Sequence, residues 1–323
     1  MKLRLARSAA WIERRIDLLI WRKHRIAGVI EPYIGYATPD HLVVRGRVLS
    51  TRRMAQAHAG QSRWTNLIQM LRLFVTDEVA HVQVTAGPQS TETDEEGYFT
   101  LRLPRTLAQG WTEVEVQAGN VRAICPVMIG HADAAFGVIS EIDDTQMQTG
   151  AYRIWRNIWT SLTGNALTRK VFPDAVALMT VLHAGGCNPV FYVSSSPWNF
   201  HSFLTQVFAR AGSPRGPMFL RDYGISETQF ITGTHGDHKG TAIDRVLAAS
   251  PDIAFVLIGD TGQHDAQVYH DAVLRHAGRV AHVVLRVAGG VDQTNLDLIA
   301  KIRAAGVPVT VGTDYADAIT AFS

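Results

Sequence analysis

A chain of 323 residues is longer than one ordinary domain and favours two domains of unequal size. With 46% hydrophobic and 19% charged residues it can bury a sizeable core, which excludes wholesale disorder, collagen-like repeats and coiled coil. A net charge of +2 argues against nucleic acid as a partner, and two cysteines exclude a disulfide framework and predict a cytoplasmic location.

The first 25 residues are strongly basic, because eight Lys and Arg residues are accompanied only by Glu13 and Asp17. Apolar residues recur there at helical spacing, so we expect an amphipathic basic helix within residues 1–35. Two interpretations stay open. The apolar stripe packs on the protein's own body, or the helix makes peripheral contact with an anionic membrane.

Residues 36–130 have the pattern of strands and turns and predict a small β-sandwich. The expected strands lie at 41–49, 79–85, 98–103, 111–117 and 121–128. The run from Thr93 to Gly97 is typical of a hairpin turn, and residues 62–74 favour a helical insert. One hypothesis for this domain and the basic helix is a docking module that is independent of catalysis.

From residue 131 to residue 323, short apolar strands alternate with helices, which predicts an α/β domain with a doubly wound parallel sheet. The expected strands lie at 136–140, 190–194, 218–220, 254–258, 282–287 and 307–311. The expected helices lie at 175–183, 200–211, 239–248, 265–276 and 295–304. In such sheets ligands bind outside the carboxyl ends of the strands, so residues that follow each strand are the candidates for a site.

Two carboxylates follow the first of these strands, Glu141 and Asp143. Side chains at i and i+2 of an extended chain point the same way, so we expect these two to lie side by side. Such a pair suits phosphoryl transfer, because one carboxylate can attack phosphorus while the other handles the proton of the leaving oxygen. A solvated acidic loop is the competing interpretation.

The next two motifs carry groups that bind anions. Ser194 follows the second strand. The register of that strand favours Ser194 over Ser195 as the hydroxyl that donates to a phosphoryl oxygen. Lys239 opens a helix, where the macrodipole disfavours a cation, so an anionic partner is expected there.

A metal site is predicted after the fourth strand. Asp260 follows that strand directly, where an unpaired carboxylate is costly unless a cation neutralises it. Asp265 opens the next helix, where it can also act as an N-cap. Oxygen ligands without thiolates select a hard ion such as Mg²⁺. His235 and His238 form an H-x-x-H pair, but no third ligand lies nearby in the sequence, so zinc is the weaker hypothesis.

Taken in order, these motifs resemble the four-motif set of the haloacid dehalogenase superfamily. In particular, they resemble the catalytic domain of the actin-patch-associated phosphatidate phosphatases and their bacterial homologues. The residues that carry the resemblance are Ile142-Asp143-Asp144-Thr145, Phe191 to Trp198, Leu220 to Tyr223, His238-Lys239 and Gly259 to Asp265. It covers residues 131–290 and places a short cap segment at 146–172.

The resemblance implies a Mg²⁺-dependent phosphatase that hydrolyses phosphatidate or a related lipid phosphomonoester through a phospho-carboxylate intermediate. It implies a general acid/base role for Asp143 and phosphoryl binding by Ser194 and Lys239. The implied metal ligands are Glu141, Asp143, Asp260 and Asp265, and the implied substrate-binding residues are Thr145, Ser195, Trp198 and Arg221.

The chain departs from the family at one position, because Glu141 stands where the family has its nucleophilic aspartate. The extra methylene displaces the attacking oxygen by about an ångström, and such a misplacement can lower the rate by roughly a hundredfold. The alternative function is therefore a catalytically impaired homologue that binds Mg²⁺ and phosphate. A less favoured alternative moves the nucleophile to Asp143.

Overall fold

The structure is a computed structural model, and it describes residues 27–50, 78–105, 109–147, 171–221 and 235–323. Three features expected from the sequence lie outside these ranges. They are the basic stretch at 1–26, the helical insert at 62–74 and most of the cap segment, residues 148–170.

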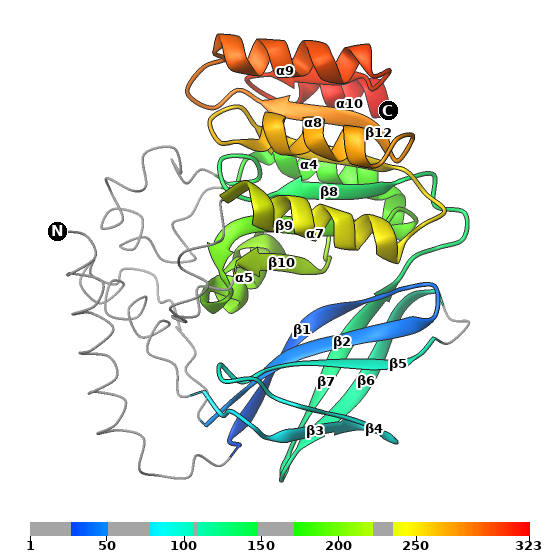
Figure 1. Ribbon diagram of the computed structural model, residues 1–323, viewed down its shortest axis with the longest axis vertical. Helices are drawn as coiled ribbons and strands as arrows, with labels where there is room; N and C mark the ends of the chain where they lie inside the picture. The colour runs from blue at the N-terminus through cyan, green and yellow to red at the C-terminus, as the bar shows by residue number, and fades with distance from the viewer. Residues whose placement is uncertain (1–26, 51–77, 106–108, 148–170, 222–234) are drawn as a thin grey trace, which may run out of the picture.

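The second half of the chain forms a six-stranded parallel sheet (Figure 1). Its strands are β8 (Gly137–Glu141), β9 (Val190–Pro197), β10 (Met218–Arg221), β11 (Phe255–Asp260), β12 (Val280–Arg286) and β13 (Val309–Gly312). Their order in the sheet is β10-β9-β8-β11-β12-β13, so the strand order reverses direction between β8 and β11. Ligands bind at such a switch point in open α/β sheets. The expected parallel α/β sheet is confirmed.

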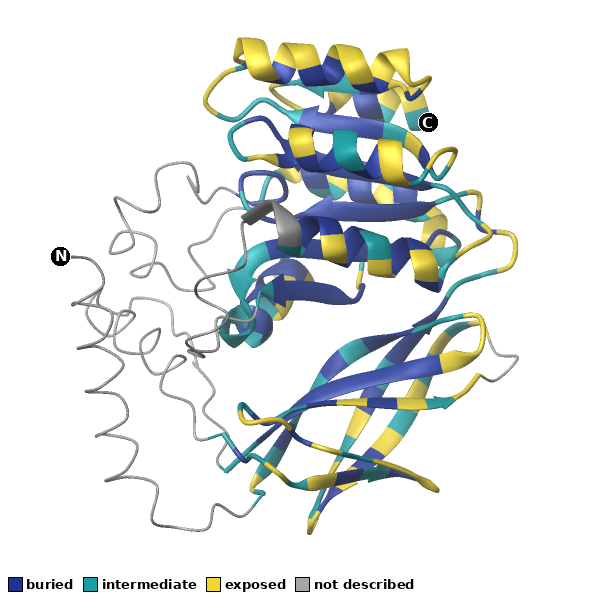
Figure 2. Cartoon of the chain, viewed as in Figure 1, coloured by how far each residue is buried: buried dark blue, intermediate teal, exposed yellow. Residues whose placement is uncertain are grey.

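Helices cover both faces of this sheet. They are α4 (Pro173–His183), α5 (His201–Ala211), α7 (His235–Ala249), α8 (Asp265–Arg275), α9 (Gln293–Ala304) and α10 (Ala316–Phe322), with short 3-10 turns η1 (Ala184–Gly186) and η2 (Trp198–Phe200). Helices α7, α8 and α9 share one buried core with the sheet, and α4, α5 and α10 share the other. The central strands are buried throughout because both faces are covered (Figure 2). No helix in the described ranges combines the length and apolarity that a membrane span requires.

The first half forms one seven-stranded sheet rather than the two sheets of a sandwich. Its strands are β1 (Val29–Ala37), β2 (His41–Leu49), β3 (Gln83–Ala86), β4 (Gln89–Glu92), β5 (Tyr98–Pro104), β6 (Gly110–Ala118) and β7 (Val121–Ile129). The order is β4-β3-β6-β7-β1-β2-β5, and all pairings are antiparallel except that of β1 with β7. The two end strands, β4 and β5, contact each other, so the sheet curves into a nearly closed barrel around its own core.

The turn at 93–97 does not form the expected hairpin. Gly97 has a positive φ of 79°, and Asp94 accepts hydrogen bonds from the amides of Glu96 and Tyr98, so the local turn chemistry is as predicted. The strands on either side, however, pair with β3 and β2 and not with each other. The turn therefore carries the chain from one end of the sheet to the other.

Strand β1 was not predicted, and it extends across the expected boundary at residue 35. Pro32 and Gly35 interrupt its sequence, and both residues are typically depleted in strands. The structure explains Gly35: an added Cβ would lie 2.2 Å from the carbonyl oxygen of Val43. Between Tyr33 and Tyr36 the register with β2 shifts, so a bulge accommodates the irregular sequence.

The bulge joins the two halves of the molecule. Residues three apart on a regular strand face opposite sides, but here both Tyr33 and Tyr36 contact the α/β domain. Tyr36 packs on Phe191 and Phe219, at ring centroid distances of 6.4 and 5.6 Å, and belongs to the same buried core as the parallel sheet. The domains therefore share apolar core and are not simply tethered.

We expect Gly35→Ala to lower the free energy of unfolding by about 1–3 kcal/mol, because the new methyl group overlaps a backbone carbonyl that cannot move independently. Denaturant unfolding measures the effect. The matched control is Gly130→Ala, whose added Cβ would meet only Pro189 at an ordinary 4.0 Å. Equal stability of the two variants would contradict the role of the bulge.

Candidate active site

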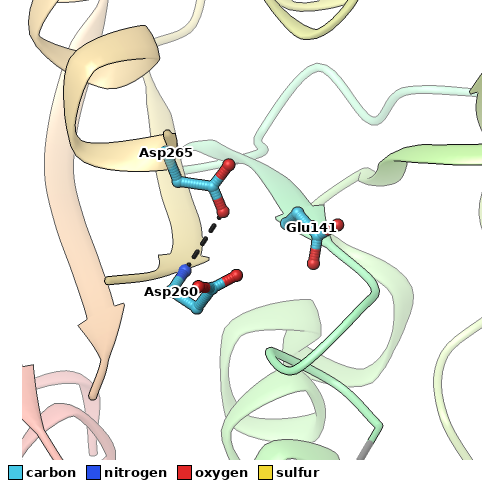
Figure 3. A group of neighbouring side chains, drawn as sticks. All are labelled: Glu141, Asp260 and Asp265. Carbon is cyan, nitrogen blue, oxygen red and sulfur yellow. Dashed lines mark hydrogen bonds between the residues drawn. The ribbon is translucent and has the colours of Figure 1, made fainter. Parts of the chain in front are cut away.

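The candidate site lies at the switch point of the parallel sheet. Glu141 is the last residue of β8 and Asp260 the last residue of β11, and these two strands pair with each other. Asp265 begins α8, and Lys239 lies in the second turn of α7. The carboxyl groups of Glu141, Asp260 and Asp265 converge on one small region (Figure 3).

The three carboxylates are close enough to bind one ion. Each offers an oxygen, and these oxygens lie within 4.8 Å of one another. All three side chains are buried, with residue exposures of 1% for Glu141 and 0% for Asp260 and Asp265. Like charges at this separation, out of contact with water, repel strongly, so the cluster requires compensating positive charge.

Lys239 supplies part of that charge. Its Nζ forms a short contact with Asp265 Oδ1 and lies 3.5 Å from Glu141 Oε1. Burial alone would lower the pKa of this ammonium group, but attraction to Asp265 and Glu141 outweighs it and raises the pKa above its ordinary value. Lys239 is therefore a protonated, buried cation, and the expectation of an anionic partner for it is met by carboxylates.

One lysine does not balance three carboxylates, and the cluster carries a net charge of −2 when all are ionised. Burial raises the pKa of Glu141 well above its ordinary value, with only partial relief from Lys239. Burial and the neighbouring Asp265 raise the pKa of Asp260 to about 8. Without a further cation, protons are held in the cluster at neutral pH.

The hydrogen bonds show where a cation fits. Both oxygens of Glu141 and the Oδ2 atom of Asp260 are buried without a hydrogen-bond partner among the described residues. Asp260 Oδ1 accepts from the amides of Gly262 and Gln263, at 2.6 and 2.8 Å. Such unsatisfied carboxylate oxygens are costly unless an ion binds them, and a hard divalent cation such as Mg²⁺ matches both their chemistry and the net charge.

Asp265 plays a different part from the other two carboxylates. Its Oδ1 contacts Lys239, and its Oδ2 accepts from the backbone amide of Asp260 at 3.1 Å. Both oxygens are thus already engaged in fixing the lysine and the end of β11. Gly259 is required for this arrangement, since an added Cβ would lie 2.6 Å from Asp265 Oδ2.

Asp143 is not among the three carboxylates whose oxygens lie within 4.8 Å of one another, but it lies close enough to help raise the pKa of Glu141. Its Oδ2 accepts from the hydroxyls of Ser194 and Ser196, each at 2.8 Å. Asp143 itself lies beyond β8, which ends at Glu141. Asp144 has a positive φ of 54°, a conformation that aspartate tolerates, and its amide donates to Met147 O.

The other predicted residues are distributed around this cluster. Ser194 is buried and donates to Asp143, and Thr145 is buried with no partner found for its hydroxyl within the described structure. Ser195 lies in the same strand end, and Arg221 pairs with Pro197 across β10 and β9. These positions border the carboxyl edge of the sheet, and their contact with substrate stays a prediction.

The predicted contact of Trp198 with substrate stays a prediction, and the histidine pair was the weaker hypothesis for a metal site. Trp198 stacks on Tyr33 of the barrel-like domain, with ring centroids 4.7 Å apart. The carboxylate group contains no histidine among the described residues, and the side chain of His235 lies outside them, so zinc gains no support.

Two residues that contribute to the site were not predicted from the sequence. Ser196 holds Asp143 together with Ser194, and its position two residues further along the strand was the available signal. Gln263 Oε1 accepts a hydrogen bond from Lys239 Nζ at 3.5 Å. Its Nε2 donates to the carbonyl oxygen of Asp143 at 3.4 Å. Its place inside the loop from Asp260 to Asp265 gave no such indication.

The segment that contains these residues is similar to a known protein family. Residues 136–287 match the family model of the phosphatidate phosphatase APP1 catalytic domain. The APP1 match runs from just before β8 to just after β12, so it contains Glu141, Lys239 and Asp260 and leaves out the barrel-like domain.

Two curated relatives are similar to this chain. It is 29% identical over 150 residues to the phosphatidate phosphatase APP1 of Saccharomyces cerevisiae, which covers 46% of this chain and 25% of the relative. It is 25% identical over 235 residues to an uncharacterized protein of Schizosaccharomyces pombe, which covers 67% of this chain and 37% of that protein. The chain thus spans a minor part of the length of both relatives.

A solved structure, a carbohydrate acetylesterase from Xanthomonas citri, aligns over 87% of this chain and 74% of that one with a TM-score of 0.26 and 10% identity. This likeness is too low to inform fold or function.

The raised pKa of Asp260 predicts a pH-dependent response to Mg²⁺. A carboxyl group whose pKa rises on folding stabilises the metal-free fold below its unfolded pKa of about 4, and that stability is lost as pH rises through about 8. A bound cation restores it. We expect saturating Mg²⁺ to raise Tm by about 5 °C at pH 9 and by much less at pH 6.

Differential scanning calorimetry at the two pH values measures this shift. Asp260→Asn removes the ligand and should abolish it, whereas Asp252→Asn, an exposed aspartate on the preceding turn, should leave it unchanged. A pH-independent shift, or the same shift in Asp260→Asn, would contradict cation binding at this cluster.

Proposed function

We propose that this protein is a Mg²⁺-dependent phosphatase of haloacid dehalogenase type that hydrolyses a phosphomonoester, with phosphatidate or a related lipid phosphate as the substrate class. The observation that carries the proposal is the convergence of Glu141, Asp260 and Lys239 at the switch point of the sheet. The match of the same segment to the APP1 catalytic domain supports phosphatidate as substrate class.

The first half-reaction uses the two carboxylates in different roles. A Glu141 oxygen attacks phosphorus as the bond from phosphorus to the leaving oxygen breaks, which gives a phospho-glutamyl group. Asp143 in its protonated form gives its proton to the leaving oxygen. A bound Mg²⁺ would neutralise charge on the phosphoryl oxygens, and Glu141 and Asp260 are the residues that would hold it.

The second half-reaction reverses the proton transfer. Asp143, now ionised, takes a proton from water while the water oxygen attacks phosphorus, and the bond between phosphorus and Glu141 breaks to release phosphate. Lys239 stabilises the negative charge on the phosphoryl group throughout, since it is protonated and already lies 3.5 Å from Glu141. Ser194 contacts Asp143 in this structure, so binding a phosphoryl oxygen through its hydroxyl requires it to release that contact.

The glutamate at the nucleophile position favours a second candidate, a protein that binds Mg²⁺ and phosphate without turnover. The structure accommodates the longer side chain, and within the described part of the chain neither of its oxygens has a hydrogen-bond partner. The attacking oxygen is nonetheless displaced from where an aspartate would hold it, by about one methylene.

Peripheral contact of the basic N-terminal segment with an anionic membrane stays a prediction from the sequence.

We expect slow, Mg²⁺-dependent release of phosphate by the unmodified chain and a rate increase of about ten- to a hundredfold in Glu141→Asp, because the shorter side chain restores the attack distance. Phosphate release is measured from phosphatidate in mixed micelles and from an aryl phosphate, with Mg²⁺ and with chelator. Asp252→Asn is the matched control for Asp260→Asn, which should be inactive.

The outcomes separate the candidates. No turnover by either the unmodified chain or Glu141→Asp would overturn the phosphatase. Activity only in Glu141→Asp would favour the binding protein, and equal rates on both substrates at saturation would argue against a lipid-specific site.

A further inference from the structure

The segment that orients Asp143 is not held by regular strand pairing. Val193 of β9 pairs with Phe219 of β10, and the next pair along is Pro197 with Arg221. Between these two pairs the chain advances by four residues in β9 but by only two in β10. The serines between Val193 and Pro197 therefore form a bulge. Ladder hydrogen bonds cannot by themselves fix the position of these serines.

This bulged segment determines where Asp143 points. The hydroxyls of Ser194 and Ser196 both donate to Asp143 Oδ2, and the Ser196 amide donates to Ser194 Oγ at 2.9 Å. The segment and the carboxylate thus form one small network. A shift of the segment would move the carboxylate with it.

The far end of the segment is held by the barrel-like domain. Trp198 directly follows Pro197, and its ring stacks on Tyr33 of β1 with centroids 4.7 Å apart and an interplanar angle of 17°. Tyr33 also packs against His201, the first residue of α5, at 4.2 Å. Tyr33 is 3% exposed, so this contact is inside the protein and not on its surface.

Arg45 of β2 completes this contact from the same domain. Its guanidinium donates to Ile34 O in β1 at 2.9 Å and to Met218 O in β10 at 3.2 Å. The guanidinium carbon lies 5.6 Å from the centroid of the Trp198 ring and 4.7 Å from that of Phe219. Although burial lowers the pKa of Arg45 to about 10, the group stays charged at neutral pH.

We propose that Tyr33 and Arg45 are positioning residues for the Asp143 acid/base, acting through Trp198 and the serine bulge. The barrel-like domain is then part of the catalytic unit, in contrast to the hypothesis of an independent docking module. This inference rests on the proposed function. It predicts that disturbing the β1 contact slows proton transfer while leaving the carboxylate cluster around Lys239 intact.

A double-mutant cycle tests it. Tyr33→Leu keeps apolar volume but removes the flat ring, and we expect kcat on the aryl phosphate to fall about tenfold with KM changed less than about threefold. In the Asp143→Asn background the same substitution should have no further effect on kcat, because the residue through which it acts is already disabled. A merely structural role would instead give independent, multiplicative losses.

Two further variants keep the test decisive. Tyr33→Phe should retain most activity, because the buried Tyr33 hydroxyl has no hydrogen-bond partner among the residues that the structure describes and only the ring is used. Arg45→Met should reproduce the loss of kcat if Tyr33→Leu fails to fold. Arg122→Ala, which removes an exposed ion pair with Glu115 in the same domain, is the matched control and should leave kcat unchanged.

The possible results separate a failure of this inference from a failure of the proposed function. The cycle is run in the Glu141→Asp background if the unmodified chain is too slow, and the Mg²⁺-induced rise in Tm is measured for every variant. Full activity in Tyr33→Leu, or losses that multiply in the Asp143→Asn background, would overturn the inference while leaving the phosphatase in place. Absence of turnover in both the unmodified chain and Glu141→Asp would instead overturn the proposed function, and the inference with it.

Discussion

The structure depends on how three buried carboxylates are kept together at the edge of a sheet. Glu141 and Asp260 are brought together because β8 and β11 are parallel neighbours, and beyond the pair of Ile258 with Ser140, β8 ends at the next residue and β11 one residue later. Their mutual repulsion is only partly offset by Lys239. The protein therefore maintains, at some cost in stability, a site that is strongly attractive to a divalent cation. Buried carboxylates with strongly raised pKa values cluster at functional sites.

Much of this site was predictable because parallel strands impose simple geometry. Glu141 and Asp260 each follow a buried strand in the sequence, and carboxyl ends of parallel strands lie at one edge. The pairing of Lys239 with Asp265 was not predictable, since Lys239 lies in the second turn of α7 and Asp265 begins α8, and nothing local says that these two helices present their first turns to one another. The hydrogen bonds that hold Asp143 were not predictable, because period-two alternation holds only within a strand and β8 ends two residues earlier.

The same contrast applies to the fold. The strands and helices of the α/β domain follow their apolar runs closely, whereas β1 escaped detection because Pro32 and Gly35 normally mark turns. Its irregularity is compensated by tertiary contacts that no local pattern contains. Tyr33 and Trp198 lie 165 positions apart in the chain, yet they stack at 4.7 Å. The two domains therefore form one packed unit, joined by this aromatic contact and by Arg45, which hydrogen-bonds to Met218 O and lies near the Trp198 ring.

The central position of β1 governs how the chain can be shortened. Although β1 is the first strand of the described residues, it lies between β7 and β2 in the interior of the barrel-like sheet. Removing it would expose two hydrogen-bonding edges at once, one of them on the strand that leads directly into β8. Proteolytic fragments or shortened genes that begin after residue 37 are thus prone to edge-to-edge aggregation, and a useful minimal fragment has to retain Val29 to Ala37.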